Sequence, residues 1–264
     1  MSEPITRVER DGAVARLIID NPAARNGLTA DACRHAAAAL REAGADPAVR
    51  VVVVEGAGGH FCSGADLRAA GALVGMDDDA VRAYVREGFQ PLVEAVWGCA
   101  KPTLAVVRGA CVGFGFDLAL ACDLRLAAGS AQLAQVFSRI ALVPDGGSSF
   151  TLPRLVGLGL AMEMMLLGEK IDGHRAAALG LVNRAVPEEE LAALAADWTA
   201  RLAAGPPIAF RLGRENLRAG ALGGTLADAL DREAAAQVSC LRSADLGRGV
   251  AAFFARKAPE FKGD

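Results

Sequence analysis

The chain has 264 residues, 53% of them hydrophobic, which is enough for one large domain or for a domain with a helical appendage. Its formal net charge is −3 and its pI is about 5.7, and no basic stripe stands out, so we expect no nucleic-acid partner. Because the N-terminus lacks the apolar stretch of a signal peptide and no segment approaches the roughly 20 apolar residues of a membrane span, we expect no membrane contact and a cytoplasmic location.

The six cysteines show no Cys-x-x-Cys spacing, and the three histidines lie far apart in the sequence. Zinc sites need clustered ligands of these types, and disulfides are rare in a reducing compartment. We therefore expect buried free thiols, with no metal site and no disulfide.

Strand and helix patterns alternate along the first two-thirds of the sequence. Continuous β-branched runs are typical of buried parallel strands, whereas alanine-rich stretches favour helices. We expect strands over residues 13–20, 50–58, 101–110 and 123–128, and helices over 30–44, 77–100 and part of 143–157. Thr29 is placed to cap the first helix and Gly44 to end it, and the second helix is interrupted near Gly88–Pro91. This alternation predicts an α/β fold.

The last third of the sequence is mainly helical. Residues 158–169 are apolar nearly all round a helix, so we expect this segment to be buried, with its methionines filling the core. A short helix ended by Gly180 and a strand follow within residues 172–186. From residue 188 onward the pattern is helical, broken at Pro206 and Pro207, which indicates a helical appendage.

Two strand–turn–helix units, VVVVEGAGGHFCSGADL (51–67) and TLAVVRGACVGFGFDL (103–118), carry glycine near the turn. The second is a poor dinucleotide fingerprint, because Leu118 stands where the third glycine of G-x-G-x-x-G belongs. Free N–H groups at helix starts carry partial positive charge, and two of them converging on one carbonyl oxygen would stabilise an enolate or a tetrahedral anion. Ordinary tight turns have the same composition, so the residues alone leave both interpretations open.

These segments resemble the paired signatures of the crotonase (enoyl-CoA hydratase/isomerase) superfamily: FCSGADL resembles its first oxyanion segment, and RGACVGFGFDLALACD its second. The resemblance continues in order through AQLAQVFSRIALVPDGGSSFTLPRLVG, LGLVNRAVP and RGVAAFFARKAPEFKG. It implies a crotonase-like spiral of ββα units over residues 1–195 and a C-terminal helical trimerisation region over 196–264. The implied partners are an acyl-CoA thioester substrate and further copies of the chain, in a homotrimer or a hexamer of two trimers. No cofactor is implied beyond the coenzyme A of the substrate.

The resemblance also implies roles for individual residues. The thioester oxygen would lie between the backbone N–H groups of Ala65 and Phe114, where Phe114 replaces a glycine common in the family. The residues implied to contact substrate or coenzyme A are Ala24, Arg25, Ser63, Gly64, Asp66, Leu67 and Phe137, with Phe253 and Lys257 reaching the coenzyme from a neighbouring subunit. Lys257 suits a phosphate chemically, but a solvated surface lysine is an equally good interpretation.

The acid–base residues determine the reaction. Family hydratases use two glutamates to activate one water, and by motif these fall at Asp117 and Phe137, so the two-carboxylate water site is broken. Asp145, in VPDGGSS, stands where related isomerases carry a functional aspartate, and one carboxylate suffices to move a double bond. An apolar neighbour such as Phe137 would raise the pKa of Asp145 above its ordinary value of about 3.9 by desolvation.

Both acids have structural alternatives. Asp145 could be the N-cap of the helix that starts in GGSSF, and Asp117 could be a buried acid paired with Arg125 or Arg139. The sequence most resembles the branch that contains the ring-epoxide isomerase of phenylacetyl-CoA breakdown. We therefore expect an enoyl-CoA isomerase with Asp145 as proton shuttle. A hydratase that uses Asp117 with Asp145, and an acyl-CoA binder without turnover, are the alternatives.

Overall fold

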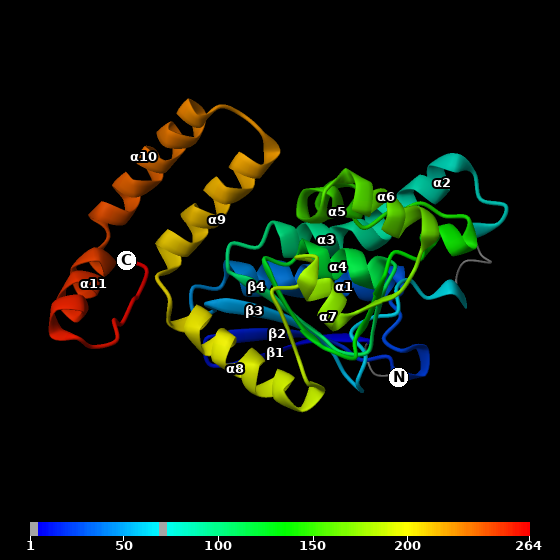
Figure 1. The fold of residues 1–264 in the computed structure, drawn as a ribbon, viewed down its shortest axis with the longest axis horizontal. Coiled ribbons are helices and arrows are strands. Elements are labelled where there is room, and N and C mark those ends of the chain that lie inside the picture. Colours follow the sequence, from blue (N-terminus) through cyan, green and yellow to red (C-terminus); the bar gives the residue numbers. More distant parts are fainter. Residues whose placement is uncertain (1–4, 69–72) are drawn as a thin grey trace.

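The computed structural model in Figure 1 describes residues 5–68 and 73–264. Within these residues the main sheet has six strands in the order β1-β2-β3-β4-β6-β9, with β1 antiparallel to β2 and every other pairing parallel. A second, smaller sheet has the order β5-β7-β8. The strands are β1 (Thr6–Asp11), β2 (Val14–Ile19), β3 (Val51–Gly56), β4 (Thr103–Val107), β5 (Ala110–Val112), β6 (Leu124–Ala128), β7 (Gln132–Ala134), β8 (Ile171–Asp172) and β9 (Arg184–Val186). The expected buried strands are thus confirmed as β2, β3, β4 and β6.

Two strands followed by a helix recur along the chain. β1 and β2 lead into α1 (Ala30–Ala45), β4 and β5 into α4 (Phe114–Ala121), and β6 and β7, after a loop, into α5 (Ser148–Val156). This recurrence is the expected ββα spiral. Backbone hydrogen bonds connect successive turns of the spiral, such as those from Cys62 N to Ala110 O (2.9 Å) and from Val112 N to Cys62 O (3.0 Å).

Helix α1 packs against α3 (Gln90–Trp97) and the first strands of the main sheet. The Thr29 side chain accepts a hydrogen bond from Ala32 N, as expected of the N-cap. The prediction that Gly44 ends the helix is wrong, because Gly44 is buried inside it and a methyl group there would lie 3.3 Å from the Cys99 sulfur. A glycine at this position lets α1 pack closely against Cys99, and it is not needed to end the helix.

The long helical segment after residue 77 is built from α2 (Asp78–Ala83), the π-helical turn η3 (Tyr84–Phe89) and α3. The interruption expected near Gly88–Pro91 is therefore a change of helical pitch rather than a break. A methyl group on Gly88 would lie 2.8 Å from the Ala30 side chain, so the small residue lets this segment approach α1. The sequence HFCSGADLRAAG (60–71) is typical of a loop that turns into a helix, and its last residues, 69–71, lie outside the described residues.

Helix α6 (Leu158–Leu167) corrects a prediction. Only one side of this apolar helix packs on the core, through Ala161 and Met164. Leu158 and Leu166 are 64% and 62% exposed, and Met162 is exposed too. In the single chain the helix is therefore not buried all round, and a large apolar face stays open to solvent.

After α7 (Gly173–Ala178) and β9, helix α8 (Glu188–Ala204) packs on β3, β4, β6 and β9. Helices α9 (Pro207–Leu222), α10 (Leu226–Arg242) and α11 (Ala244–Ala255) then form an arm that projects from the body (Figure 1). The expected boundary between residues 195 and 196 falls inside α8, whereas the arm itself leaves after Gly205. Among residues 5–68 and 73–264, no helix combines the length and apolar content needed to cross a membrane.

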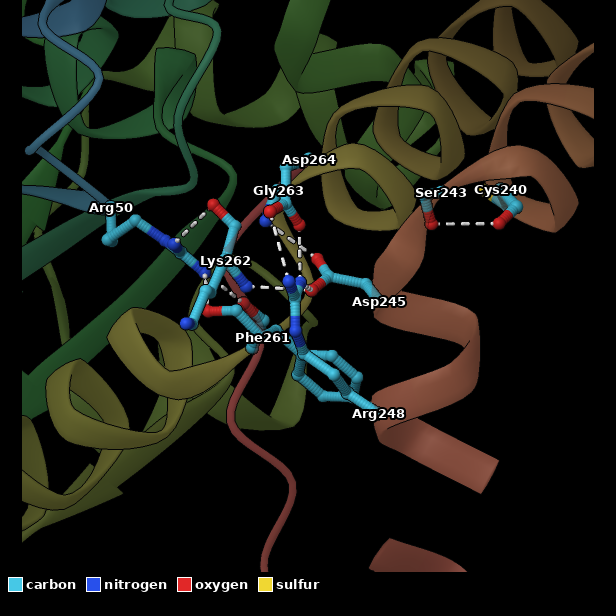
Figure 2. A network of polar contacts seen from close by, with 10 residues as sticks. Arg50, Cys240, Ser243, Asp245, Arg248, Phe261, Lys262, Gly263 and Asp264 are labelled. Carbon is cyan, nitrogen blue, oxygen red and sulfur yellow. Dashed lines mark hydrogen bonds and ion pairs between the residues drawn. The ribbon is translucent and has the colours of Figure 1, made fainter. Parts of the chain in front are cut away.

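The C-terminal segment folds back along the arm (Figure 2). The buried Asp245 carboxylate accepts hydrogen bonds from the backbone N–H groups of Lys262 (2.7 Å) and Gly263 (2.8 Å) and pairs with Arg248. Arg50, directly before β3, donates to the Phe261 carbonyl (3.2 Å). These contacts tie the base of α11 to the body.

Candidate active site

Two segments lie against each other at the start of α4, and each carries a backbone N–H without a partner among the described residues. Leu28 N donates to Gly64 O (2.9 Å) and Asp66 N donates to Leu28 O (2.8 Å), so the N–H of Ala65 faces the other side of this extended segment. Phe114 is the first residue of α4, so its N–H has no partner within the helix. A methyl group on Gly64 would lie 3.5 Å from Phe114 N, which places the two segments in contact.

Neither Ala65 N nor Phe114 N donates a hydrogen bond to any other residue that the structure describes. Gly64 (φ +99°) and Gly113 (φ +56°) hold backbone conformations that favour glycine, so both segments are shaped by residues without side chains. The Phe114 ring is buried and packs edge-on against Phe89, with the ring centroids 5.3 Å apart. Two adjacent free N–H donors are what an oxyanion hole requires.

Asp117 lies one helical turn further along α4 and is 1% exposed. Its carboxylate accepts hydrogen bonds from Gln135 Nε2 (2.8 Å) and Gly146 N (2.9 Å). Burial raises the pKa of Asp117 to about 6, against the lowering effect of Gln135, Ser148 and the Gly146 N–H. The carboxylate is thus poised to exchange a proton near neutral pH.

The alternative in which Asp117 pairs with an arginine is wrong. Arg125 instead donates to the carbonyl groups of Leu181 and Cys122, and Arg139 makes no ion pair with Asp117. The partners of Asp117 are neutral amide and hydroxyl groups, which leave its charge uncompensated. An uncompensated buried carboxylate is more typical of acid–base chemistry than of a structural ion pair.

Asp145 lies in the loop before α5, half-buried, and its Oδ1 atom is buried without a hydrogen-bond partner among the described residues. It does not cap α5, because the N-cap is Gly147 and no side chain caps the helix. Burial raises the pKa of Asp145, and its charge in turn contributes to the raised pKa of Asp117 and of Cys33 on α1. The carboxyl group therefore lies within electrostatic reach of α1 and α4.

Aromatic rings line the same region. Tyr84 contacts Phe89 edge-on at 5.6 Å, and Phe89 contacts Phe114. Phe137, in the short helical turn η4 (Phe137–Ile140), is buried, and a methyl group on Gly113 would lie 4.0 Å from its ring. Sequence reasoning missed Tyr84 and Phe89, although a tyrosine in a chain with only one was a usable signal.

A model of the family described as enoyl-CoA hydratase/isomerase matches residues 9–264. The chain belongs to the enoyl-CoA hydratase/isomerase family. It is 40% identical to a probable enoyl-CoA hydratase of Rhodobacter capsulatus, over all of both chains, and 31% identical to the 1,2-epoxyphenylacetyl-CoA isomerase of Escherichia coli, over 98% of both. The crystal structure of an enoyl-CoA hydratase from Bacillus anthracis superposes with a TM-score of 0.91 at 30% identity, covering 98% of this chain and all of that one. The architecture described above is therefore the crotonase fold, and the protein is an enzyme of this family.

In this enoyl-CoA hydratase/isomerase family member, most residues expected to contact coenzyme A are gathered beside the oxyanion segments. Ala24 ends the short helical turn η1 (Pro22–Ala24), and its carbonyl accepts a hydrogen bond from Ser63 Oγ (2.6 Å). Arg25 follows in a left-handed conformation (φ 49°) with an exposed side chain. The segment of Gly64, Asp66 and Leu67 runs alongside, and Leu67 is exposed.

The Asp66 carboxylate is paired with Arg68 (2.6 Å), which lowers its pKa, so this residue is an anion at neutral pH. The backbone N–H of Asp66 donates a hydrogen bond to the Leu28 carbonyl oxygen. A negatively charged side chain does not attract phosphate, so any contact of this segment with the coenzyme would involve backbone atoms or the Arg68 guanidinium.

Phe253 and Lys257 lie away from the site formed by the same chain. Phe253 lies on α11 and is 78% exposed, and Lys257 follows that helix with its side chain in solvent. Figure 1 shows α11 in the arm, apart from α1 and α4. No group of three or more His, Cys, Asp or Glu side chains suited to a metal ion occurs among the residues that the structure describes.

Proposed function

We propose that this enzyme binds an enoyl-CoA thioester with its carbonyl oxygen between the N–H groups of Ala65 and Phe114, and that Asp145 shifts the double bond. The observation that carries this proposal is the buried, unpartnered Asp145 Oδ1, whose charge acts on Asp117 in the helix that begins with the free N–H of Phe114. A carboxylate in that state can accept a proton without first losing a protein partner.

The proposed reaction is a proton transfer in two steps. Asp145 takes a proton from C2 of a 3-enoyl-CoA, and the electron pair of that C–H bond delocalises into a dienolate whose charge rests largely on the thioester oxygen. The two N–H groups stabilise this charge. Asp145 then returns the proton to C4, which gives the conjugated 2-enoyl-CoA. Because only a proton moves, we expect no cofactor beyond the coenzyme A of the substrate.

The raised pKa of Asp145 supports this role, because a base of higher pKa has a greater driving force for taking a carbon-bound proton. Phe137 supports it too, since an apolar ring at this position keeps water from the intermediate. The aromatic wall of Tyr84, Phe89 and Phe114, together with the likeness to the 1,2-epoxyphenylacetyl-CoA isomerase, favours planar or ring-derived acyl groups.

Hydration of a 2-enoyl-CoA is the second candidate, and the relation of Asp117 to Asp145 favours it. The two carboxyl groups are coupled electrostatically and Asp117 has a pKa of about 6, so one could act as acid while the other acts as base. Against it stands Phe137, which occupies the position of the second carboxylate in the hydratase pattern.

Two absorbance assays separate these functions. A 3-enoyl-CoA should gain the absorbance of the conjugated thioester when the enzyme is added, whereas a hydratase would remove that absorbance from crotonyl-CoA. If binding of both thioesters is measurable and neither changes, the protein is an acyl-CoA binder without turnover. Our proposal requires that the absorbance of the conjugated thioester rises with the 3-enoyl-CoA and does not fall with crotonyl-CoA.

We further propose that the enzyme works as a homotrimer, or as a hexamer of two trimers, in which Phe253 and Lys257 of one chain reach the coenzyme bound to another. The open apolar faces of α6 and of the arm support this, as Leu217 and Leu226 are 77% and 76% exposed. All six cysteines are free thiols, which suits a reducing compartment such as the cytoplasm. Sedimentation velocity of the full chain, with a monomer as the contradicting result, tests the assembly.

A further inference from the structure

Two polar side chains, Gln135 and Ser148, form a hydrogen-bonded cluster with Asp117. Gln135 follows strand β7 and is fully buried, and Ser148 is the first residue of α5 and is buried too. The Gln135 Nε2 atom lies 2.8 Å from Asp117 Oδ1 and 2.5 Å from Ser148 Oγ, so both of its N–H groups are engaged. The cluster joins the acid on α4 to β7 and α5.

The other end of the same carboxamide is unsatisfied. Gln135 Oε1 is buried and has no hydrogen-bond partner among the described residues. A buried acceptor without a donor is unfavourable, and such atoms in native proteins call for an explanation. Here the orientation follows from the ionised carboxylate: turning Oε1 toward Asp117 would place two acceptor oxygens against each other.

Protonation of Asp117 reverses this preference. The acid form carries an O–H that needs an acceptor, and Ser148 can rotate its hydroxyl to donate as well. If the carboxamide turns by 180° about its last side-chain bond, Oε1 accepts from both groups and the formerly orphaned oxygen is satisfied. The terminal torsion of glutamine is broad and the two ends of the amide have almost the same shape, so the turn needs little space.

We propose that the Gln135 carboxamide is a two-state positioning group, which donates to Asp117 when that carboxylate is ionised and turns to accept from it when it is protonated. The inference rests on the second candidate of the proposed function, hydration, in which Asp117 takes part in proton transfer, and it deepens that candidate because a group held in place in both protonation states can take up a proton and return it without reorienting. Gln135 itself touches no reacting atom, so its role is to position Asp117.

The surroundings allow the turn. Gln135 and Ser148 line a cavity of about 170 Å³ between α5 and α6, whose other walls include Leu152 and Met165. A water molecule there can donate to the outer end of the amide in one state and accept from it in the other. The titratable groups that act on Asp117 or feel its charge are Asp145, on the loop before α5, and Cys111, on β5.

Those neighbours predict the pH at which the turn occurs. Burial gives Asp117 a pKa of about 6, and the pKa of the Cys111 thiol is raised well above its ordinary value, so Cys111 stays neutral through this range. Of these two neighbours, only Asp145 contributes a charge in this range, and its ionised carboxylate raises the pKa of Asp117. The change in Gln135 should therefore follow the titration of Asp117.

The chain suits a direct test, because it contains only four glutamines: Gln90, Gln132, Gln135 and Gln237. Side-chain ¹⁵N-glutamine labelling of the full-length protein gives four carboxamide groups in an NMR spectrum, and Gln135→Met identifies the signals of Gln135 by their loss. We expect these signals to move with pH with a midpoint near 6, while those of the exposed Gln132, three residues earlier on β7, stay nearly constant. Asp117→Asn should remove the transition. Signals of Gln135 that do not change between pH 5 and 8 in the wild-type protein would overturn the proposal.

Enzyme kinetics gives a second, independent measurement. Gln135→Met removes a donor to the ionised Asp117, so the midpoint of any pH dependence due to Asp117 should rise by about one unit, whereas Gln132→Met should leave it unchanged. A lower rate with an unchanged pH midpoint would point to a merely structural role for Gln135 and contradict the inference. The NMR titration needs no substrate, so it can succeed or fail regardless of whether the enzyme shifts double bonds.

Discussion

Gly64 and Phe114 meet where the two oxyanion segments converge, because a methyl group on Gly64 would lie 3.5 Å from the Phe114 backbone nitrogen. The same methyl group would lie 3.1 Å from the Val112 carbonyl oxygen, so it would crowd the junction at which the Phe114 N–H is proposed to meet the thioester oxygen. We expect Gly64→Ala to lower kcat by about 10²–10³-fold, the usual effect of losing one oxyanion donor.

The control for this variant is Gly180→Ala. Gly180 also has a positive φ (+77°), but no described atom lies within 4 Å of an added methyl group. Both substitutions strain the backbone by about 1–2 kcal/mol, so both should lower the melting temperature. Equal losses of activity in the two variants would show that strain, and not a blocked donor, explains the effect.

Asp117 should make stability depend on pH in an unusual direction. Its pKa is about 6 in the folded protein and about 3.9 in an unfolded chain, so between these values the folded state binds more protons. The contribution of this group is therefore fully present below about pH 4 and is lost as the pH rises through 6, by about 3 kcal/mol in total.

The comparison with Asp117→Asn isolates this contribution, because the amide has nearly the same shape and does not titrate. Urea unfolding at pH 4.5 and pH 7.5 should show the variant gaining free energy of unfolding relative to wild type as the pH rises. A difference between the two proteins that stays constant over this range would mean that the carboxyl group is not buried as described.

The tail contacts of Asp245 should hold α11 in place. Burial raises the pKa of Asp245, but hydrogen bonds from the Lys262 N–H, the Arg248 side chain and the Gly263 N–H lower it by more. The net pKa is therefore below the ordinary value. Its contribution to stability is thus present above about pH 4 and is lost as the pH falls through the folded-state pKa. We expect Asp245→Asn to speed amide hydrogen exchange at residues 261–264 at pH 7, while exchange in α4 stays unchanged; protection of the tail equal to wild type would contradict this.

The long elements could be predicted from the sequence because their patterns are local. The valine run of β3 and the alanine-rich α1 appear where expected. Strands β5, β7 and β8 were missed, since two or three residues are too few to show an alternation. Strand β1 was missed as well, because most of its residues are charged and exposed. The open face of α6 was mispredicted because an apolar surface has the same sequence whether its own chain or another molecule covers it.

The site was predictable in part for a similar reason. Asp117 and Asp145 stood out through motif position, and the structure brings both to the start of α4 and α5. Gln135 and Ser148 did not stand out, because a single amide or hydroxyl in a loop reads as a surface residue. Their burial arises from β7 meeting α5, a contact between segments that no local pattern records.

The central claim, that Asp145 removes the C2 proton while the two N–H groups hold the thioester oxygen, is tested most directly by following the fate of that hydrogen. A 3-enoyl-CoA that carries two deuterium atoms at C2 should yield a conjugated product with deuterium at C4, because Asp145 carries the hydrogen from one carbon to the other. Asp145→Asn should slow this transfer by about 10²–10⁴-fold while its Kd for the same thioester changes little. Transfer by Asp145→Asn at the wild-type rate would contradict the account.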